Sequence, residues 1–420
     1  MRLPLAMLLA CVPCAAQVAP AATLAERAAQ GDAAAQNGLG EAIRDGRGMP
    51  RDPAGAFRWF TQAAGQGQLD AVHNLALCYS DGAGVPQDLA KAFALLKQAA
   101  AAKHPGALAD LAQAYFQGLG TDQDLDKGLT ALRKSASLGS PEGQYHLGVA
   151  LRDGNLIKQD LPKALEWFRL AAGQGQVQAM IALGSASFRG DGVPTDLAVS
   201  YGWFRKAAEA GEPAAQEQVA FCLETGSGVA KDPIQAFVWN EKAALAGWAP
   251  SQRRLGVALL DGAGVAADRE RAGQWLQKAA TAGDAPAMLA YGILLLGWSN
   301  GQAKADAGLG WVKKAAALGN APALTALGNF WATGTLLAKD PVQAALCYRK
   351  AAAQGDPEAL FRLGRCLEAG FGLAVDRKLA RQCFAEAAKL GRAGAKEALE
   401  RLDQGGTKPA EAAGKVVLGS

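Results

Sequence analysis

A unit of 36 residues recurs along this chain, and a repeat of that length restricts the possible folds more than any other feature. The stretch 183–216 shows one unit: an apolar segment, a turn with Gly190 and Gly192, a second segment opened by Asp196, and a closing Gly211. Glycine takes the left-handed conformation that ends many helices, and aspartate caps the free amides at a helix start. Each unit is therefore predicted to be a pair of helices.

The closing glycine and the capping aspartate keep their spacing from unit to unit. Lys103 is the one substitute among the glycines, and Lys304 is the one substitute among the aspartates. The glycines are Gly31, Gly67, Gly139, Gly175, Gly211, Gly247, Gly283, Gly319, Gly355 and Gly391. The aspartates are Asp52, Asp88, Asp124, Asp160, Asp196, Asp232, Asp268, Asp340 and Asp376. Ten complete units follow, and they must stack, because one hairpin cannot bury its apolar face alone.

The order LG, GxGV, D, an aromatic pair such as WF, KAA and a closing G resembles the Sel1-like repeat, a longer-looped relative of the tetratricopeptide repeat. The resemblance implies an all-α fold, a right-handed α/α solenoid of about ten 36-residue helix hairpins. The unit from Asp284 to Gly319 departs from the pattern, because GWSNGQAKAD replaces its glycine turn. Residues 296–307 are therefore either a ligand-shaping loop or a repeat that has lost its turn signals.

The two ends of the chain differ from the repeats. Residues 1–21 contain one arginine and a short apolar run, and we expect a cleaved export signal of the bacterial type. Lipid attachment at Cys11 and a helical extension are the alternatives. The solenoid is predicted over residues 22–404 with a lone capping helix at each end, followed by a disordered tail at 405–420. The expected location is periplasmic or secreted.

Three columns of the repeat are predicted to serve packing. The second residue of the AA pair is alanine in all ten units, and the column from Gly40 to Gly364 is always glycine or alanine, which lets helices approach closely. The third column is Trp59, Trp167, Trp203, Trp239, Trp275 and Trp311, replaced elsewhere by Leu95, Ala131, Cys347 and Cys383. Core packing is the favoured interpretation of these tryptophans, over ligand stacking.

The cysteines and the net charge bear on disulfide bonding and on the class of partner. Loss of the signal would leave five of the seven cysteines, so at least one thiol is free. Only Cys366 with Cys383 is a bridge to consider, and buried thiols are the favoured interpretation. The formal charge of +4 gives no support to nucleic-acid binding, and no transmembrane span is expected.

The sequence offers no catalytic apparatus. His73 and His146 lie two repeats apart and cannot share a metal, and His104 is interpreted as a surface loop residue. Cysteine-rich secreted members of the Sel1-like family are linked to β-lactam binding or hydrolysis, but their regular cysteine pairs and the S-x-x-K, S-D-N and K-T-G motifs are missing here. We expect no catalytic residue, cofactor or metal. A cell-envelope β-lactamase-like hydrolase or a peptidoglycan-fragment binder is the alternative.

The repeat architecture favours a protein-protein interaction scaffold or adaptor that binds peptide or protein segments. First helices are expected to line the concave face of such a solenoid, and Arg, Phe and Tyr are enriched at interfaces. The predicted partner-binding residues are Glu41, Arg44, His73, Tyr145, Arg152, Phe188, Phe221, Arg253, Phe361 and Arg365. Self-association through the repeat ends is a further alternative, and the oligomeric state stays open.

Overall fold

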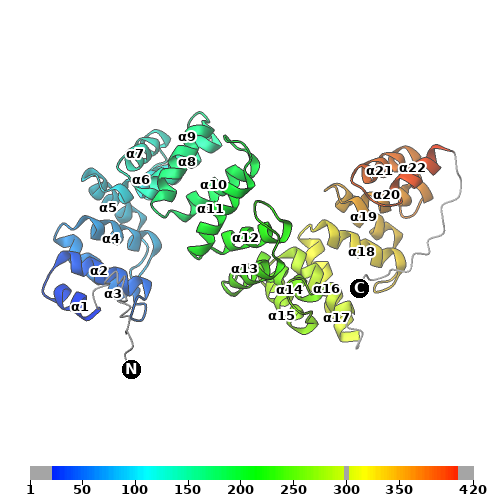
Figure 1. Ribbon diagram of the computed structural model, residues 1–420, viewed down its shortest axis with the longest axis horizontal. Coiled ribbons are helices and arrows are strands. Elements are labelled where there is room, and N and C mark those ends of the chain that lie inside the picture. The colour runs from blue at the N-terminus through cyan, green and yellow to red at the C-terminus, as the bar shows by residue number, and fades with distance from the viewer. Residues whose placement is uncertain (1–20, 298–301, 405–420) are drawn as a thin grey trace, which may run out of the picture. The chain divides into compact units, whose positions relative to one another are not determined.

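The computed structural model describes residues 21–297 and 302–404, and within them the regular elements are α-helices (Figure 1). The helices belong to two compact units, one ending at Thr195 and the other beginning at Asp196. The expected export signal, except for its last residue, and the expected tail at 405–420 lie outside the described residues. Each unit is described below by itself.

The first unit contains helices α1 to α10. Their bounds are α1 (Ala21–Ala29), α2 (Ala33–Asp45), α3 (Pro53–Gly65), α4 (Leu69–Asp81), α5 (Leu89–Ala101), α6 (Pro105–Gln117), α7 (Leu125–Ser137), α8 (Pro141–Asp153), α9 (Leu161–Gly173) and α10 (Val177–Arg189). From α2 to α9, each even-numbered helix forms a hairpin with the helix that follows it, and each hairpin packs on the next. The lone helix α1 packs on α2.

The second unit contains helices α11 to α22. Their bounds are α11 (Leu197–Glu209), α12 (Pro213–Thr225), α13 (Pro233–Leu245), α14 (Ala249–Asp261), α15 (Arg269–Thr281), α16 (Ala285–Gly297), α17 (Gln302–Ala317), α18 (Ala321–Thr333), α19 (Pro341–Ala352), α20 (Pro357–Ala369), α21 (Arg377–Lys389) and α22 (Ala395–Asp403). Hairpins from α12–α13 to α20–α21 stack in chain order, and α22 packs on α21. The predicted all-α fold of stacked 36-residue hairpins is confirmed.

The sequence marks of each helix end are also confirmed. The nine predicted aspartates are the N-caps of second helices; Asp52, for example, accepts a hydrogen bond from the amide of Gly55 at 2.9 Å. The closing glycines all have positive φ, between 78° and 96°. Lys103, their one substitute, keeps the left-handed conformation at φ 63°. The backbone of the repeat therefore tolerates a residue that rarely adopts this conformation.

The small column explains how the two helices of a hairpin meet. A Cβ added at Gly40 would lie 2.6 Å from the ring of Phe60, and the same closeness occurs between Gly148 and Phe168. Repeats with alanine in this column place a smaller residue opposite; the pairs are Ala76 with Leu96, Ala112 with Leu132, and Ala220 with Asn240. Most hairpins thus exchange volume between the two helices, as close packing requires, whereas Gly256 faces Leu276 and Gly292 faces Val312.

The alanine pair also packs, but the deeper residue is the first of the two. That first residue is fully buried in all ten repeats, with Ser135 as the one substitute for alanine. The second alanine, to which we assigned the close contact, is buried in seven repeats and half-buried at Ala64, Ala352 and Ala388. The more deeply buried position therefore lies one residue earlier than the alanine that we assigned to the contact.

The tryptophan column lies at the edge of the core, not inside it. All six rings are half-buried, and Trp59, Trp167, Trp275 and Trp311 pack against buried clusters. The fully buried ring in several repeats belongs to the next residue, as in Phe60, Phe168 and Phe384. The expectation of core packing therefore holds only in part. Four rings carry a lysine three residues further on; the Nζ-to-centroid distances are 4.4 Å for Lys206 on Trp203, 4.1 Å for Lys242 on Trp239, 4.1 Å for Lys278 on Trp275 and 4.4 Å for Lys314 on Trp311.

The divergent repeat at 285–320 starts its second helix early. Helix α17 begins at Gln302 and has 16 residues, so Lys304, which stands where other repeats carry the capping aspartate, lies inside the helix. Of the proposed loop at 296–307, residues 298–301 lie outside the described residues. Between 21 and 297 and between 302 and 404, no helix is long and apolar enough to cross a bilayer.

Candidate functional site

The ten predicted binding residues all lie on first helices. Glu41 and Arg44 are on α2, His73 is on α4, and Tyr145 and Arg152 are on α8. The remaining positions are Phe188 on α10, Phe221 on α12, Arg253 on α14, and Phe361 and Arg365 on α20. Their placement follows from the repeat period, because equal spacing puts equivalent residues on equivalent helix faces. Their role in binding stays a prediction.

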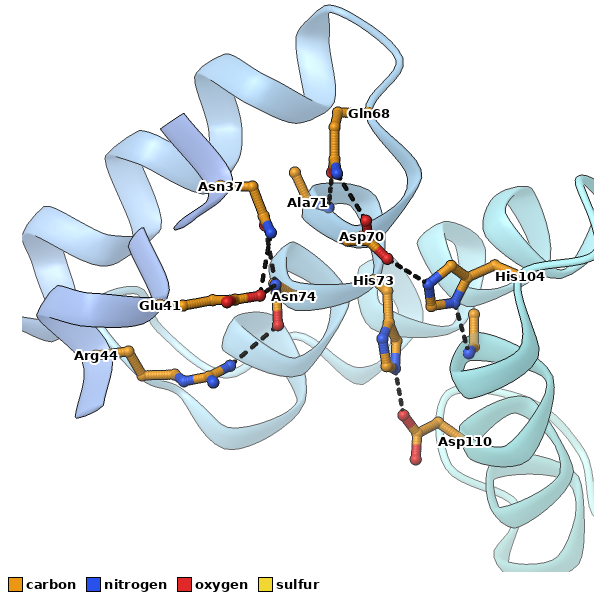
Figure 2. A network of polar contacts seen from close by, with 11 residues as sticks. Asn37, Glu41, Arg44, Gln68, Asp70, Ala71, His73, Asn74, His104 and Asp110 are labelled. Atoms are coloured by element: carbon orange, nitrogen blue, oxygen red, sulfur yellow. Dashed lines mark hydrogen bonds and ion pairs between the residues drawn. The ribbon is translucent and has the colours of Figure 1, made fainter. Parts of the chain in front are cut away.

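In the first unit, α2 and α4 share a polar network around Asn74 (Figure 2). The amide nitrogen of Asn74 donates to Asn37 at 2.9 Å and to Glu41 at 3.2 Å, and Arg44 donates to the Asn74 oxygen at 3.0 Å. Asn37 also donates to Glu41 at 3.0 Å, and both asparagines are only 7% exposed. Glu41 and Arg44 are therefore brought together, but through a buried asparagine that the sequence analysis left out.

A second network joins α4 to α6 through two histidines (Figure 2). The His73 Nε2 lies 2.5 Å from the Asp110 carboxylate, and the His104 Nε2 lies 3.0 Å from Asp70. The two imidazole centroids are 4.9 Å apart. His104 also caps α6, because its Nδ1 accepts from the Ala107 amide at 3.0 Å, and its side chain is only 14% exposed. His104 therefore lies in the loop before α6, as expected, but it is not a surface residue.

The contacts of His104 identify which of its ring nitrogens carries the proton. Because the Ala107 amide donates to His104 Nδ1, the neutral ring carries its proton on Nε2 and donates it to Asp70. This hydrogen bond is the main reason why the pKa of Asp70 lies below its usual value. Burial lowers the pKa of His146 on α8, two repeats after His73, which favours its neutral form. The contact between His104 and Asp70 thus favours the ionised form of that carboxylate.

Helices α8, α9 and α10 enclose a groove of about 210 Å³ within the first unit. Its apolar wall includes Leu165, Phe168 and Ile181. Tyr145 lies at the wall with its ring centroid 5.9 Å from that of Phe168, and Arg152 reaches the groove from the same helix. Gln178, Ser185 and Arg189 of α10 and the following Asp191 complete the polar lining. Two predicted residues therefore meet in one concave feature with an apolar wall and two guanidinium groups.

Both arginines of the groove form ion pairs with aspartates that lie one or two residues later in the sequence. Arg152 pairs with Asp153 at 2.7 Å, and Arg189 pairs with Asp191 at 2.7 Å. The Arg189 side chain is 57% exposed and that of Arg152 is 39% exposed. Exposed pairs of this kind contribute little to stability. A partner carboxylate could therefore compete for these guanidinium groups at small cost.

In the second unit, α12 and α14 are also joined by polar contacts, as α2 and α4 are in the first. Arg254 pairs with Glu217 at 3.1 Å and with Glu224 at 3.0 Å, and its guanidinium lies 5.7 Å from the ring centroid of Phe221. Arg253, the predicted residue, pairs instead with Asp284 at 3.2 Å. The structure thus separates Arg253 from the Phe221 cluster and places its unpredicted neighbour there.

The last predicted pair lies on α20. The Phe361 ring is 5.6 Å from that of Phe384 and carries the Arg392 guanidinium 4.7 Å from its centroid. Glu358 forms ion pairs with both Arg362 and Arg392. Arg365 is half-buried on the same helix. Among the predicted aromatic residues, Phe188 is the most open, with 39% of its surface exposed.

The residues that sequence reasoning missed follow a rule of spacing. A first-helix residue contacts the residue 37 positions later, one repeat plus one, in the pairs Asn37 with Asn74, His73 with Asp110, and Glu217 with Arg254. Complementary residue types at that offset were visible in the sequence. Three of the missed residues, Asn74, Asp110 and Arg254, therefore lie one position further along the next first helix than their partners.

The described residues offer no metal centre and no activated thiol. No group of three His, Cys, Asp or Glu side chains in 21–297 and 302–404 is arranged to hold a metal ion. The five cysteines of these ranges are free and buried, so Cys366 and Cys383 are not bridged. Burial raises the pKa of the Cys366 thiol to about 11. Such a thiol is a packing residue, since reactive cysteines have lowered pKa values.

A family model described as the Sel1 repeat matches ten consecutive segments of the chain. The segments are residues 33–68, 69–104, 105–140, 141–176, 177–212, 213–248, 249–284, 285–320, 321–356 and 357–391. They reproduce the ten units of the sequence, including the divergent one. No curated protein matches the chain.

Solved structures give similar matches. A protective antigen of uropathogenic Escherichia coli strains, which displays an SLR fold, is 31% identical over 92% of this chain and 91% of its own, with a TM-score of 0.42. A Sel1 repeat protein from Oxalobacter formigenes is 24% identical over 58% of this chain and 96% of its own, with a TM-score of 0.51. An immunity protein from Pseudomonas aeruginosa is 22% identical over 56% of this chain and 90% of its own, with a TM-score of 0.39.

Proposed function

We propose that this chain, which belongs to the Sel1 repeat family, is an interaction scaffold that binds protein segments along its first helices. The observation that carries the proposal is the groove between α8 and α10, where an apolar wall meets Tyr145, Arg152 and Arg189. Aromatic and arginine side chains beside an apolar pocket are the residue types that dominate binding energy at interfaces. The groove suits an extended segment with an apolar side chain and an acidic neighbour.

The other first-helix contacts support a rigid binding surface. The Asn74 network ties α2 to α4 and the Arg254 cluster ties α12 to α14, which fixes these side chains before a partner arrives. Preorganised side chains lose less entropy on binding. The remaining predicted residues, from Glu41 to Arg365, belong to this proposal as partner contacts or as residues that hold the surface in shape.

The hydrolase alternative has no observation in its favour. It depends on a likeness to family members with regularly paired cysteines, whereas the five described cysteines of this chain are unpaired. We therefore propose a non-enzymatic role without a cofactor. We also propose export to the periplasm or the medium, which depends on the apolar segment at 1–21.

A photocrosslinking experiment tests the scaffold proposal. We would place p-benzoylphenylalanine at position 188, beside the groove-lining Arg189, and irradiate the full chain in envelope extract. The control carries the same group at position 133, an exposed site on the second helix α7. We expect a discrete adduct from position 188 alone. Mass spectrometry of that adduct then identifies the crosslinked partner protein.

The same adduct must depend on the groove. We expect Arg152→Glu, added to the position-188 probe, to abolish it, while Arg133→Glu leaves it intact. An adduct that is equally strong from both probe positions, or that survives Arg152→Glu, would show that first helices do not carry the binding. The absence of any adduct in extract from the source cells would have the same meaning.

A further inference from the structure

The tryptophan column is interrupted in the repeat at 105–140, where Ala131 takes its place. The lysine that follows three residues later is kept. In four repeats of the second unit the matching lysine lies over the tryptophan ring, as Lys278 does on Trp275 at 4.1 Å. In this repeat Lys134 holds the same position on α7, but no ring precedes it. The repeat therefore keeps the cation and lacks the aromatic group.

A hollow of about 460 Å³ lies beside Ala131 in the first unit. It is open to solvent and is bounded by α5, α6 and α7. Its apolar and aromatic lining residues are Ala100, Ala101, Leu108, Leu111, Tyr115 and Ala131. Lys97, Lys127 and Lys134 stand at the hollow, together with Asp126. None of the ten proposed partner-binding residues lines it, so it is separate from the groove at α8 and α10.

Other repeats show what fills the equivalent space. Trp275 packs in one cluster with Ala244 and Leu255, which are the counterparts of Ala100 and Leu111. Trp311 likewise packs with Ala280 and Tyr291, and its ring centroid is 5.9 Å from that of the tyrosine. The walls of the hollow are thus the surface on which a tryptophan lies elsewhere. Only the ring is missing.

The charge at the hollow is positive. Lys127 pairs with Asp124 at 2.8 Å and is therefore compensated. Over residues 21–297 and 302–404, neither Lys97 nor Lys134 forms an ion pair with a carboxylate. Lys97 and Lys134 stand against one lining carboxylate, Asp126, so the net charge beside the apolar hollow is still positive and favours an acidic chain over a basic one.

We propose that this hollow binds an aromatic side chain, tryptophan above all, from an acidic segment of a partner protein. The ring lies on Ala100, Leu111 and Ala131 and takes the place that Trp275 and Trp311 occupy in their own repeats. Lys134 covers its face, as the sister lysines cover theirs, which is a favourable cation–π contact. Acidic residues beside the aromatic side chain pair with Lys97 and Lys134. An aromatic anchor in an apolar pocket with a polar rim is a common energetic centre of an interface.

A fluorine-labelled peptide tests the proposal on the full chain. The probe is an acetylated and amidated pentapeptide with 5-fluorotryptophan between two pairs of glutamates, observed by ¹⁹F NMR as protein is added. We expect a saturable shift with the native chain. A peptide with alanine in place of the tryptophan, labelled elsewhere, is expected not to bind. Equal binding of the alanine peptide, or no shift at millimolar peptide, would overturn the proposal.

Variants then locate the binding. Ala131→Trp supplies the missing ring from the chain itself. We expect it to lower the affinity for the peptide by about tenfold or more, since an anchor of this kind commonly carries most of the binding energy. Lys134→Ala is expected to weaken it by about threefold, in line with one exposed cation–π contact. Lys206→Ala, the same charge change at the same repeat position, is the matched control and is expected to have no effect.

The variants also have to fold. Circular dichroism and a melting curve check Ala131→Trp, which we expect to melt no lower than the native chain because six other repeats carry tryptophan there. Unchanged peptide binding by folded Ala131→Trp would overturn the proposal. If that variant does not fold, Lys97→Ala with Lys134→Ala decides, and binding equal to that of the native chain is then the contradicting result.

Discussion

The ring of Phe60 lies so close to Gly40 that a Cβ at position 40 would stand 2.6 Å from it. The two residues belong to α3 and α2, the two helices of one hairpin. Further hairpins repeat the contact, with Phe168 on Gly148 and Phe384 on Gly364. The aromatic side chain fills the space that the glycine leaves, and this exchange of volume sets the distance between the helices.

Gly40→Ala is expected to destabilise the fold by about 1–3 kcal/mol, because the added methyl group must displace the buried Phe60 ring. Chemical unfolding followed by circular dichroism measures the change. The matched control is Gly202→Ala in α11, where an added Cβ meets nothing within 4 Å. That variant is expected to gain about 0.5–1 kcal/mol from helix propensity. Equal effects of the two variants would contradict the packing argument.

Lys103→Gly is expected to stabilise the chain by about 1 kcal/mol. Lys103 has φ 63°, a conformation that disfavours residues with a Cβ, whereas the other nine repeats have glycine at this turn. Removing the strain outweighs the extra freedom of glycine in the unfolded chain. The urea midpoint measures the gain. The reciprocal variant Gly67→Ala, at φ 82° in open space, should lose stability; a loss in both would mean that the Lys103 side chain makes a contact worth more than the strain.

Both predictions concern features that the sequence reveals by itself. The aspartate caps and the closing glycines are visible because they stabilise the backbone within one repeat, so the same residue types recur in each of the ten units. The small column that contains Gly40 and Ala76 is visible for the same reason, whereas its partners Phe60 and Leu96 were identified from the structure. Local rules repeated ten times leave little freedom to the fold.

The site was harder to predict because its contacts run between repeats. Asn74 joins Asn37, Glu41 and Arg44 across a helix pair, and a consensus of one repeat contains no information on such partners. His104 was misread because a histidine is an unusual N-cap, although it stands where Ser140 and Asp356 cap other first helices.

Asp70→Asn tests the histidine network through its pH dependence. The hydrogen bond from His104 lowers the pKa of Asp70, so the ionised carboxylate stabilises the folded state. This contribution is complete above the usual pKa of 3.8 and is lost as the pH falls through the lower folded value. We therefore expect the variant to be less stable than the native chain at pH 5–6, and the difference to vanish in stronger acid.

Unfolding midpoints in urea over this pH range measure the effect. Asp122→Asn, at an exposed loop position, is the control for the loss of one negative charge. A difference between Asp70→Asn and the native chain that grows on acidification would contradict the sign of the shift. A difference equal to that of Asp122→Asn at every pH would show that the contact with His104 contributes nothing.

The thiols give the last test, because burial governs their reactivity. The pKa of Cys366 is raised to about 11, and burial also raises the pKa values of Cys78, Cys222, Cys347 and Cys383. Little thiolate is present at pH 8, and the reagent cannot reach the core. A chain that starts at residue 22 should react slowly with a thiol reagent when folded and show five thiols in denaturant.

Thr61→Cys, at an exposed position of α3, is the control and should add one fast-reacting thiol to the folded chain. A count of three in denaturant without reductant would contradict the structure, because one disulfide removes two of the five thiols. Such a bridge would join Cys366 to Cys383, which share one buried cluster. The full count of five would instead show that the core of each repeat needs no covalent link, since stacking on its neighbours already buries it.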